Sequence, residues 1–219
     1  MPRIVFAREL SLLQDEILAL GSMVRYALRA SVIALRDRDA ATAQALIQGD
    51  VEINRKRFEI ESDCLRLMAT QQPMARDLRL LAAVLEITTE LERMGDYAKG
   101  IGKIILLIGP QPLMKPLVDI PLMCEQVLRM LERALDAFIR QDADAARSIA
   151  AEDDIVDDLY NKVYREIIGF LVEKPQLFDR ANYLLWAAHN LERAGDRTVN
   201  ICERVIFNVT GQMAELDAT

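Results

Sequence analysis

The sequence predicts an all-α protein that consists of two tandem, similar three-helix bundles with six long helices, as in spectrin-like repeats. The 219 residues include only 9 glycines, and aromatic residues make up 5% of the chain. Such a composition favours helices, because straight-chain side chains lose little rotamer freedom in a helix. Apolar residues also recur at alternating steps of three and four, and a six-residue motif occurs twice. These observations favour a duplicated helical bundle.

Helical spacing of apolar residues begins near the N-terminus and returns later in the chain. The first such run is Phe6, Leu10, Leu13, Ile17, Leu20 and Val24. A second run extends from Leu80 to Ile108 with the same rhythm, which places its apolar side chains on one helix face. Helix-breaking residues, mostly Pro, Gly and Asp, separate the runs. The sequence therefore predicts helices over residues 5–36, 39–71, 74–108, 118–140, 143–173 and 180–209.

A proline-rich stretch lies at the midpoint of the chain, from Gly109 to Pro116. Stretches of this kind connect modules. We therefore expect a first bundle over residues 1–108, a connector over 109–117 and a second bundle over 118–219.

The two halves share motifs. Leu91–Asp96 (LERMGD) recurs as Leu191–Asp196 (LERAGD), each time in the third predicted helix of its half. Likewise, Asp50–Asn54 is echoed by Asp153–Asp157 in each second helix. Each six-residue motif contains a mid-helix glycine, which we interpret as a point of close helix packing.

Acidic residues of the second and third helices are expected to meet. An antiparallel hairpin pairs residues at equal distances from its turn, and positions 50 and 96, like 54 and 92, are symmetric about Pro73. Positions 153 with 196 and 157 with 192 are symmetric about 174.5, beside Pro175. Residues four apart on one helix also share a face. Each half should therefore gather four oxygen-bearing side chains.

These two sets are candidate metal sites, because carboxylates held together need a compensating charge and oxygen ligands suit hard cations. The candidate ions are magnesium, manganese, calcium, iron and zinc. Since Asn54 is neutral where the second half has Asp157, we expect weaker binding in the first half. The candidate metal ligands are Asp50, Asn54, Glu92 and Asp96 in the first half, and Asp153, Asp157, Glu192 and Asp196 in the second.

Other interpretations of these acids stay open. They can form a solvated face whose charges pair with Arg25, Arg93 or Arg193. The chain is then a purely structural helical dimer without metal. Alternatively, the carboxylates activate water in a metal-dependent hydrolase. No nucleotide-binding loop or nucleophile–base motif supports catalysis, and the single histidine, His189, is interpreted as structural, so we expect a protein that is not an enzyme and has no catalytic residues.

Charge and composition limit the partners and the compartment. The net charge of −7 and the pI of about 4.9 argue against nucleic acid as a partner. The three cysteines form no CxxC pair and are odd in number, which fits buried thiols in a reducing compartment. No run of about 18 uncharged apolar residues exists. We expect a cytoplasmic protein that reaches the membrane only through its partners.

The chain resembles the PhoU family of phosphate-transport accessory proteins over nearly its whole length. The motifs that carry the resemblance are Gln72–Arg79 (QPMARDLR), Leu91–Asp96, and Leu191–Asp196 with its continuation to Glu203 (RTVNICE). The resemblance implies two three-helix bundles, metal clusters on the duplicated acids of some members, and dimers. It also implies negative regulation of the phosphate-starvation response, by linking the ATPase of the phosphate ABC transporter to a sensor histidine kinase.

The sequence departs from the family pattern near the motifs. Many relatives have His directly after the motif Asp, where this chain has Tyr97 and Arg197. Gly100 replaces an Asn that the second half retains as Asn200. At Tyr97 and Gly100 the first half therefore lacks the residues that the family pattern has beside its site.

Overall fold

The computed structural model describes residues 3–216, and within that range it contains helices and no strand. A single 3-10 turn, Pro175–Leu177, precedes the last helix. The helices are α1 (Arg3–Asp37), α2 (Ala40–Gln71), α3 (Arg76–Ile108), α4 (Asp119–Arg140), α5 (Ala143–Ala150), α6 (Asp153–Glu173) and α7 (Phe178–Thr210).

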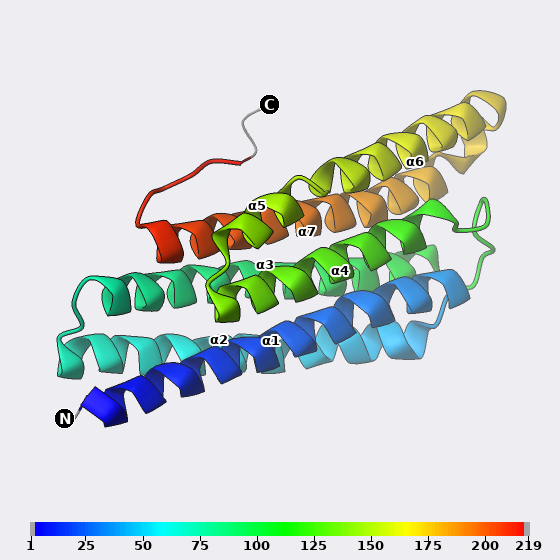
Figure 1. Cartoon of the computed structure of the whole chain (residues 1–219). Coiled ribbons are helices and arrows are strands. Elements are labelled where there is room, and N and C mark those ends of the chain that lie inside the picture. The colour runs from blue at the N-terminus through cyan, green and yellow to red at the C-terminus, as the bar shows by residue number, and fades with distance from the viewer. Residues whose placement is uncertain (1–2, 217–219) are drawn as a thin grey trace.

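The helices form two bundles that lie side by side along an elongated molecule (Figure 1). Helices α1, α2 and α3 make the first bundle, and α4, α7 and the α5–α6 pair make the second. Contacts between the bundles run along α3 and α7, and α1 also packs against α4. The predicted all-α class and the two similar bundles are confirmed.

Helix ends follow local capping chemistry. The Asp39 carboxylate caps α2 by accepting hydrogen bonds from the backbone N–H groups of Ala41 and Thr42, and Asp142 caps α5 through the N–H of Ala145. Gly109, which ends α3, has a φ of 64°, a backbone conformation that glycine adopts without strain. Five of the six predicted helices match the observed bounds to within two residues.

The predicted helix over residues 143–173 is wrong in one respect, because the structure divides it into α5 and α6. At the break, the N–H of Glu152 donates to the carbonyl of Ile149 (3.0 Å), which tightens the chain. No Gly or Pro marks this position. The acids Asp153 and Asp154 occupy the first turn of α6, where the helix dipole stabilises negative charge. They therefore favour a new helix start.

Buried apolar side chains from both bundles form one continuous core. Residues 109–118, between α3 and α4, contain no helix. The division into 1–108, 109–117 and 118–219 stays a prediction, and its ends, residues 1–2 and 217–219, lie outside the described residues.

Helix α1 is the one helix in the described range that is long and apolar enough to cross a membrane by composition, with a window of mean hydropathy 1.4 within Val5–Asp37. Arg25 and Arg29 interrupt its apolar run, so it lacks an uncharged apolar stretch of about 18 residues. Half of that window is buried inside the molecule, and α1 packs against α2, α3 and α4. Burial of this kind is typical of the core helix of a bundle.

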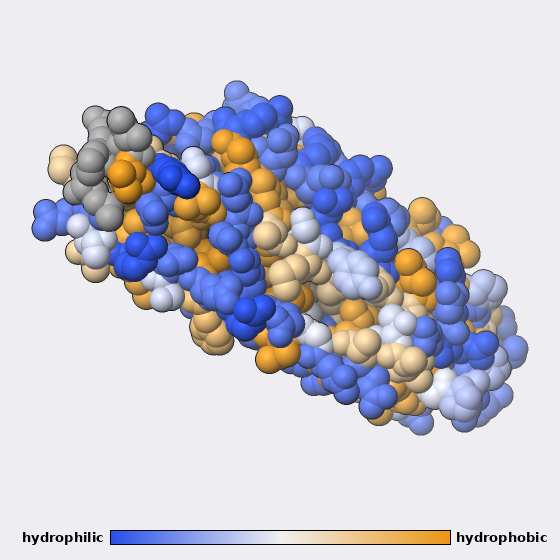
Figure 2. Space-filling view, turned by 90° about the horizontal axis from the view of Figure 1, so that it is seen from below, coloured by the Kyte–Doolittle hydropathy of each residue, from blue (hydrophilic) through white to orange (hydrophobic). Residues whose placement is uncertain are grey.

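The face that α1 and α2 present carries a band of apolar residues between polar ones (Figure 2). A cavity of about 530 Å³ opens between α1 and α2, and α3 contributes to its lining. Small residues such as Ala30, Ala45 and Gly49 line it, together with Asp50 and Lys99. The first acidic set therefore borders this cavity.

Candidate functional site

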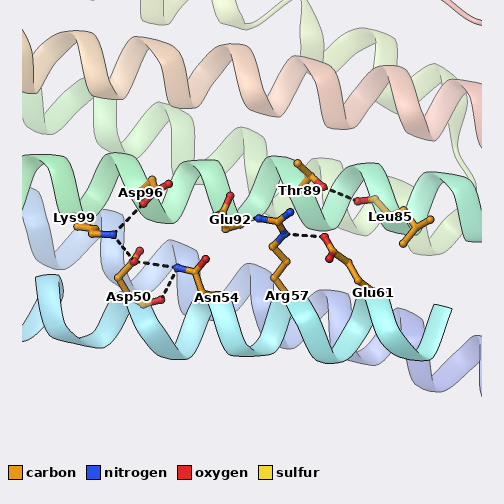
Figure 3. Close-up of polar contacts among 9 residues, drawn as sticks. All are labelled: Asp50, Asn54, Arg57, Glu61, Leu85, Thr89, Glu92, Asp96 and Lys99. Atoms are coloured by element: carbon orange, nitrogen blue, oxygen red, sulfur yellow. Dashed lines mark hydrogen bonds and ion pairs between the residues drawn. The ribbon is translucent and has the colours of Figure 1, made fainter. Parts of the chain in front are cut away.

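The first hairpin, α2–α3, brings its four predicted side chains together (Figure 3). We call Asp50, Asn54, Glu92 and Asp96 the first cluster. The Lys99 ammonium lies 2.7 Å from Asp50 Oδ2 and 3.3 Å from Asp96 Oδ1, so these two carboxylates face each other across the hairpin. The Asn54 amide donates to Asp50 Oδ2 at 3.0 Å. The pairing of Asp50 with Asp96 that symmetry about Pro73 predicts is present.

The protein's own cations neutralise much of the first cluster. Lys99 bridges the two aspartates, and burial leaves Asp50 only 6% exposed. Arg57 Nη1 lies 3.2 Å from Glu92 Oε1. Burial raises the pKa of Glu92, the Arg57 charge opposes this shift, and the charge of Asp96 adds to it. The first cluster is therefore largely compensated within the hairpin.

The second hairpin, α6–α7, gathers the other four predicted residues, and we call Asp153, Asp157, Glu192 and Asp196 the second cluster. Burial raises the pKa of Glu192, and the charge of Asp196 raises it further. The pKa of Asp157 is likewise raised by burial and then by Asp196. These mutual effects require the carboxylates to lie near one another.

Compensation of the second cluster is much poorer. Within residues 3–216, Asp157 and Asp196 accept no hydrogen bond and form no ion pair, and Glu192 pairs with no Lys or Arg. The neighbour of Glu192 Oε2 is His189 Nδ1, at 3.1 Å. The imidazole side chain is half exposed. Unlike the first cluster, the second therefore contains three carboxylates, Asp157, Glu192 and Asp196, that have no Lys or Arg partner among the described residues.

The motif glycines make room between the helices, as predicted. A Cβ at residue 95 would stand 3.0 Å from Ile53 Cδ1, so Gly95 lets α2 approach α3 closely. A Cβ at residue 195 would overlap Asp153 Oδ1. Gly195 therefore leaves space for the carboxylate of Asp153, a candidate metal ligand, whereas Gly95 leaves space for the apolar side chain of Ile53.

Neither cluster is arranged as a finished chelate. Within the described part of the chain, no three His, Cys, Asp or Glu side chains converge closely enough to hold one metal ion. The second cluster offers poorly compensated oxygens, which fit a cation after side-chain rotation. The first cluster fits poorly, because Lys99 and Arg57 already pair with one oxygen each of Asp50, Asp96 and Glu92. The assignment of all eight residues to metal binding stays a prediction.

The arginines proposed as partners of the acids lie elsewhere, so that part of the alternative is wrong. Arg25 pairs with Glu132, Arg93 pairs with Glu90, and the Arg193 guanidinium lies over the Tyr97 ring.

The positions that depart from the family pattern belong to the contact between the bundles. Glu90 of α3 accepts hydrogen bonds from Arg197 (3.2 Å) and Asn200 (3.1 Å) of α7. A Cβ at Gly100 would stand 3.3 Å from the amide of Asn190. Their roles are therefore in joining α3 to α7.

Sequence reasoning missed three residues of the site: Lys99, Arg57 and His189. Lys99 follows Asp96 by three residues, and His189 precedes Glu192 by three, so helical spacing could have identified both. Arg57 reaches Glu92 from the other helix, and no local spacing indicates this contact. The interpretation of His189 as structural stays a prediction, and its imidazole lies half exposed beside Glu192.

The three cysteines are buried and free, as expected. Burial raises the pKa of each thiol, Cys64, Cys124 and Cys202, to about 12. Thiols with such a pKa are almost wholly protonated at neutral pH and are poor nucleophiles and metal ligands. They act as core packing residues.

A model of the PhoU domain matches the chain twice, over residues 17–105 and 120–205. The chain belongs to the PhoU family. The two matches coincide with the two bundles, and each contains one acidic cluster. PhoU relatives are named as accessory or regulatory proteins of phosphate transport and not as enzymes, which agrees with the expected lack of catalysis.

Sequence relatives cover most of the PhoU chain. The "phosphate-specific transport system accessory protein PhoU homolog" of Pseudomonas aeruginosa is 36% identical over 209 residues, which is 94% of this chain and 86% of that protein. The PhoU of Escherichia coli is 33% identical over 207 residues, with the same coverage.

Solved PhoU structures share the fold. The crystal structure of the phosphate transport system regulatory protein PhoU from Streptococcus pneumoniae has a TM-score of 0.89 at 33% identity, and the match covers 96% of this chain and all of that one. PhoU from Pseudomonas aeruginosa also gives 0.89, at 35% identity, with 94% of this chain and all of that one covered.

Repulsion within the second cluster of this PhoU protein gives a pH-dependent stability. A carboxyl group whose pKa is higher in the folded chain binds more protons when folded, so stability falls as pH rises from the ordinary value towards the folded pKa. For Glu192 that window begins at 4.5 and extends upward. The penalty grows as the pH rises through that window.

We therefore predict that Glu192→Gln, studied in EDTA, raises the melting temperature at pH 7 by roughly 3 °C, because it removes one repelling charge. The gain should shrink as the pH falls through the window to 4. Glu173→Gln, at the exposed glutamate that ends α6, is the control and should change little. A lower melting temperature for Glu192→Gln at pH 7 would contradict the repulsion.

Proposed function

We propose that this protein is the accessory protein of a phosphate-specific transport system and a negative regulator of the phosphate-starvation response, acting in the cytoplasm when phosphate is plentiful. The observation that carries the proposal is the match of both halves to the PhoU domain, with relatives of that name aligned over 94% of the chain.

In this proposal the protein is an adaptor between the ATPase of the phosphate ABC transporter and a membrane-bound sensor histidine kinase. A continuous core across two bundles suits a body that presents fixed surfaces to two partners. It works as a homodimer and contacts the membrane only through these partners.

Deletion of the gene tests the regulatory role. Phosphate-replete cells that lack the protein should express their starvation genes, and a plasmid copy should silence them again. Affinity purification of the complementing copy should recover the transporter ATPase and the kinase. If the starvation genes stayed silent in the deletion strain, the regulatory proposal would be lost.

We further propose that the second cluster binds a divalent or trivalent metal ion. Among the described residues, no Lys or Arg pairs with Asp157, Glu192 or Asp196, and Gly195 gives the Asp153 carboxylate its place beside α7. A bound cation supplies the positive charge that lets these carboxylates lie together. The residues would then hold α6 against α7.

Metal analysis separates this proposal from a structural dimer without metal. Protein purified without chelator should contain stoichiometric metal, and EDTA should lower its melting temperature. Size-exclusion chromatography with light scattering should give the mass of a dimer. Absence of metal, together with melting that EDTA leaves unchanged, would favour the structural dimer.

A further inference from the structure

We infer that the first cluster does not take a metal ion, because Lys99 serves there as a tethered cation, and that metal binding by this protein is confined to the second cluster. The confinement of metal to the second cluster rests on the proposed metal role. The exclusion of metal from the first cluster rests on the geometry of that cluster alone. The two halves of the duplicated fold then perform the same neutralisation by different means.

Lys99 occupies the position where an ion shared by the two aspartates would lie. Its Nζ is 2.7 Å from Asp50 Oδ2 and 3.3 Å from Asp96 Oδ1, one oxygen from each helix of the hairpin (Figure 3). An ammonium that bridges α2 and α3 in this way supplies the positive charge that a metal would supply. A metal must displace it to reach both carboxylates.

Glu92, a further member of the first cluster, also has an internal cation, and Asp50 Oδ1 is buried without a hydrogen-bond partner. Arg57 reaches Glu92 Oε1 at 3.2 Å while its Nε lies 2.7 Å from Glu61 Oε1, so one guanidinium ties a glutamate of α3 to a glutamate of α2 (Figure 3). Asn54 directs its amide N–H, and not its oxygen, at Asp50. The cluster therefore has internal donors on three of its four members.

The second half carries neither cation. Aligning the motifs places Val199 at the position of Lys99 and Tyr160 at the position of Arg57. Val199 is 1% exposed and belongs to the core, and the Tyr160 ring lies beside His189. Neither side chain can neutralise a carboxylate. The second half thus lacks both basic residues and also has Asp157 where the first half has Asn54. The cluster with fewer basic partners therefore carries one more negative charge.

Lys99 then keeps metal ions out of the first cluster, and removal of its ammonium should let this cluster bind cations. Lys99→Met keeps the apolar stem and removes the charge. Asp50 and Asp96 are then left without their bridge and should bind a hard cation about tenfold or more tightly than in the wild type. Lys103→Met, at an exposed lysine one turn along α3, is the matched control.

The test measures binding of Mn²⁺ to the full-length protein by electron paramagnetic resonance of the free ion, with circular dichroism to verify folding. In the wild-type background, Asp196→Asn should remove the bound Mn²⁺ and Asp96→Asn should leave it unchanged. Lys99→Met should gain Mn²⁺ binding, and Asp96→Asn added to Lys99→Met should abolish the gain. Lys103→Met should behave as the wild type. If Lys99→Met does not fold, Lys99→Gln takes its place.

The outcomes separate the two claims. Loss of Mn²⁺ from the wild type on Asp96→Asn would overturn the inference, because the first cluster would then bind metal despite Lys99. No gain in the Lys99 variants would overturn it as well. If Asp196→Asn left the wild-type binding unchanged, the proposed metal role of the second cluster would fail, and the comparison of Lys99→Met with and without Asp96→Asn would still decide the role of Lys99.

Discussion

Glu90→Ala should lower the free energy of unfolding by about 3 kcal/mol, because it leaves a largely buried guanidinium without its partner. Glu90 lies in the contact between the bundles, where its side chain is 12% exposed and that of Arg197 is 18% exposed. Its carboxylate accepts hydrogen bonds from Arg197, Asn200 and Arg93. Urea unfolding followed by circular dichroism measures the loss.

Glu86→Ala is the matched control for this prediction. Glu86 lies one turn away on α3 and pairs with Arg204 at 2.7 Å, but its side chain is 48% exposed. An exposed ion pair contributes up to about 1 kcal/mol, so the control should lose much less than Glu90→Ala. Equal losses in the two variants would show that burial does not set the strength of the link. A double-mutant cycle of Glu90 with Arg197 isolates their interaction.

Gly102→Val should also cost about 3 kcal/mol of stability, through overpacking between α2 and α3. A Cβ at residue 102 would stand 3.1 Å from the carbonyl oxygen of Ala43 and 3.3 Å from Ile47 Cγ1. The first of these neighbours is backbone, so it cannot rotate away and the helices must separate. Thermal unfolding measures the effect.

Gly49→Ala is the control for the helix propensity of glycine. Gly49 lies within α2, and a Cβ there meets nothing within 4 Å. Alanine should therefore stabilise the helix by about 1 kcal/mol. If Gly102→Val were also tolerated without loss, the close approach of α2 and α3 at Ala43 would not matter to stability.

The fold was largely predictable because local signals agree with tertiary packing. Apolar spacing and breakers located five of the six predicted helices, since Pro73, Pro110 and Pro175 interrupt helices by simple steric rules. The break between α5 and α6 was missed, because it depends on three consecutive acids, Glu152–Asp154, and on no breaker residue.

The sequence predicted which acidic residues of the candidate site lie opposite each other, but not which basic side chains pair with them. Symmetry about the turn placed Asp50 opposite Asp96, because the register of an antiparallel hairpin follows from its turn. The basic partners depend on side-chain reach: Lys99 extends across the hairpin to Asp50, and Arg57 extends the other way to Glu92. Long flexible side chains have many rotamers, so spacing alone does not select one partner.

The continuous core also determines what the proline-rich segment does. Apolar side chains of both bundles merge, and α1 and α3 contact α4 and α7 directly. The peptide between Ile108 and Asp119 therefore links two bundles that already pack against each other through their side chains. A protease that nicks this segment should yield two fragments that stay together and migrate as one particle in native gels, and separately expressed halves should find each other in solution.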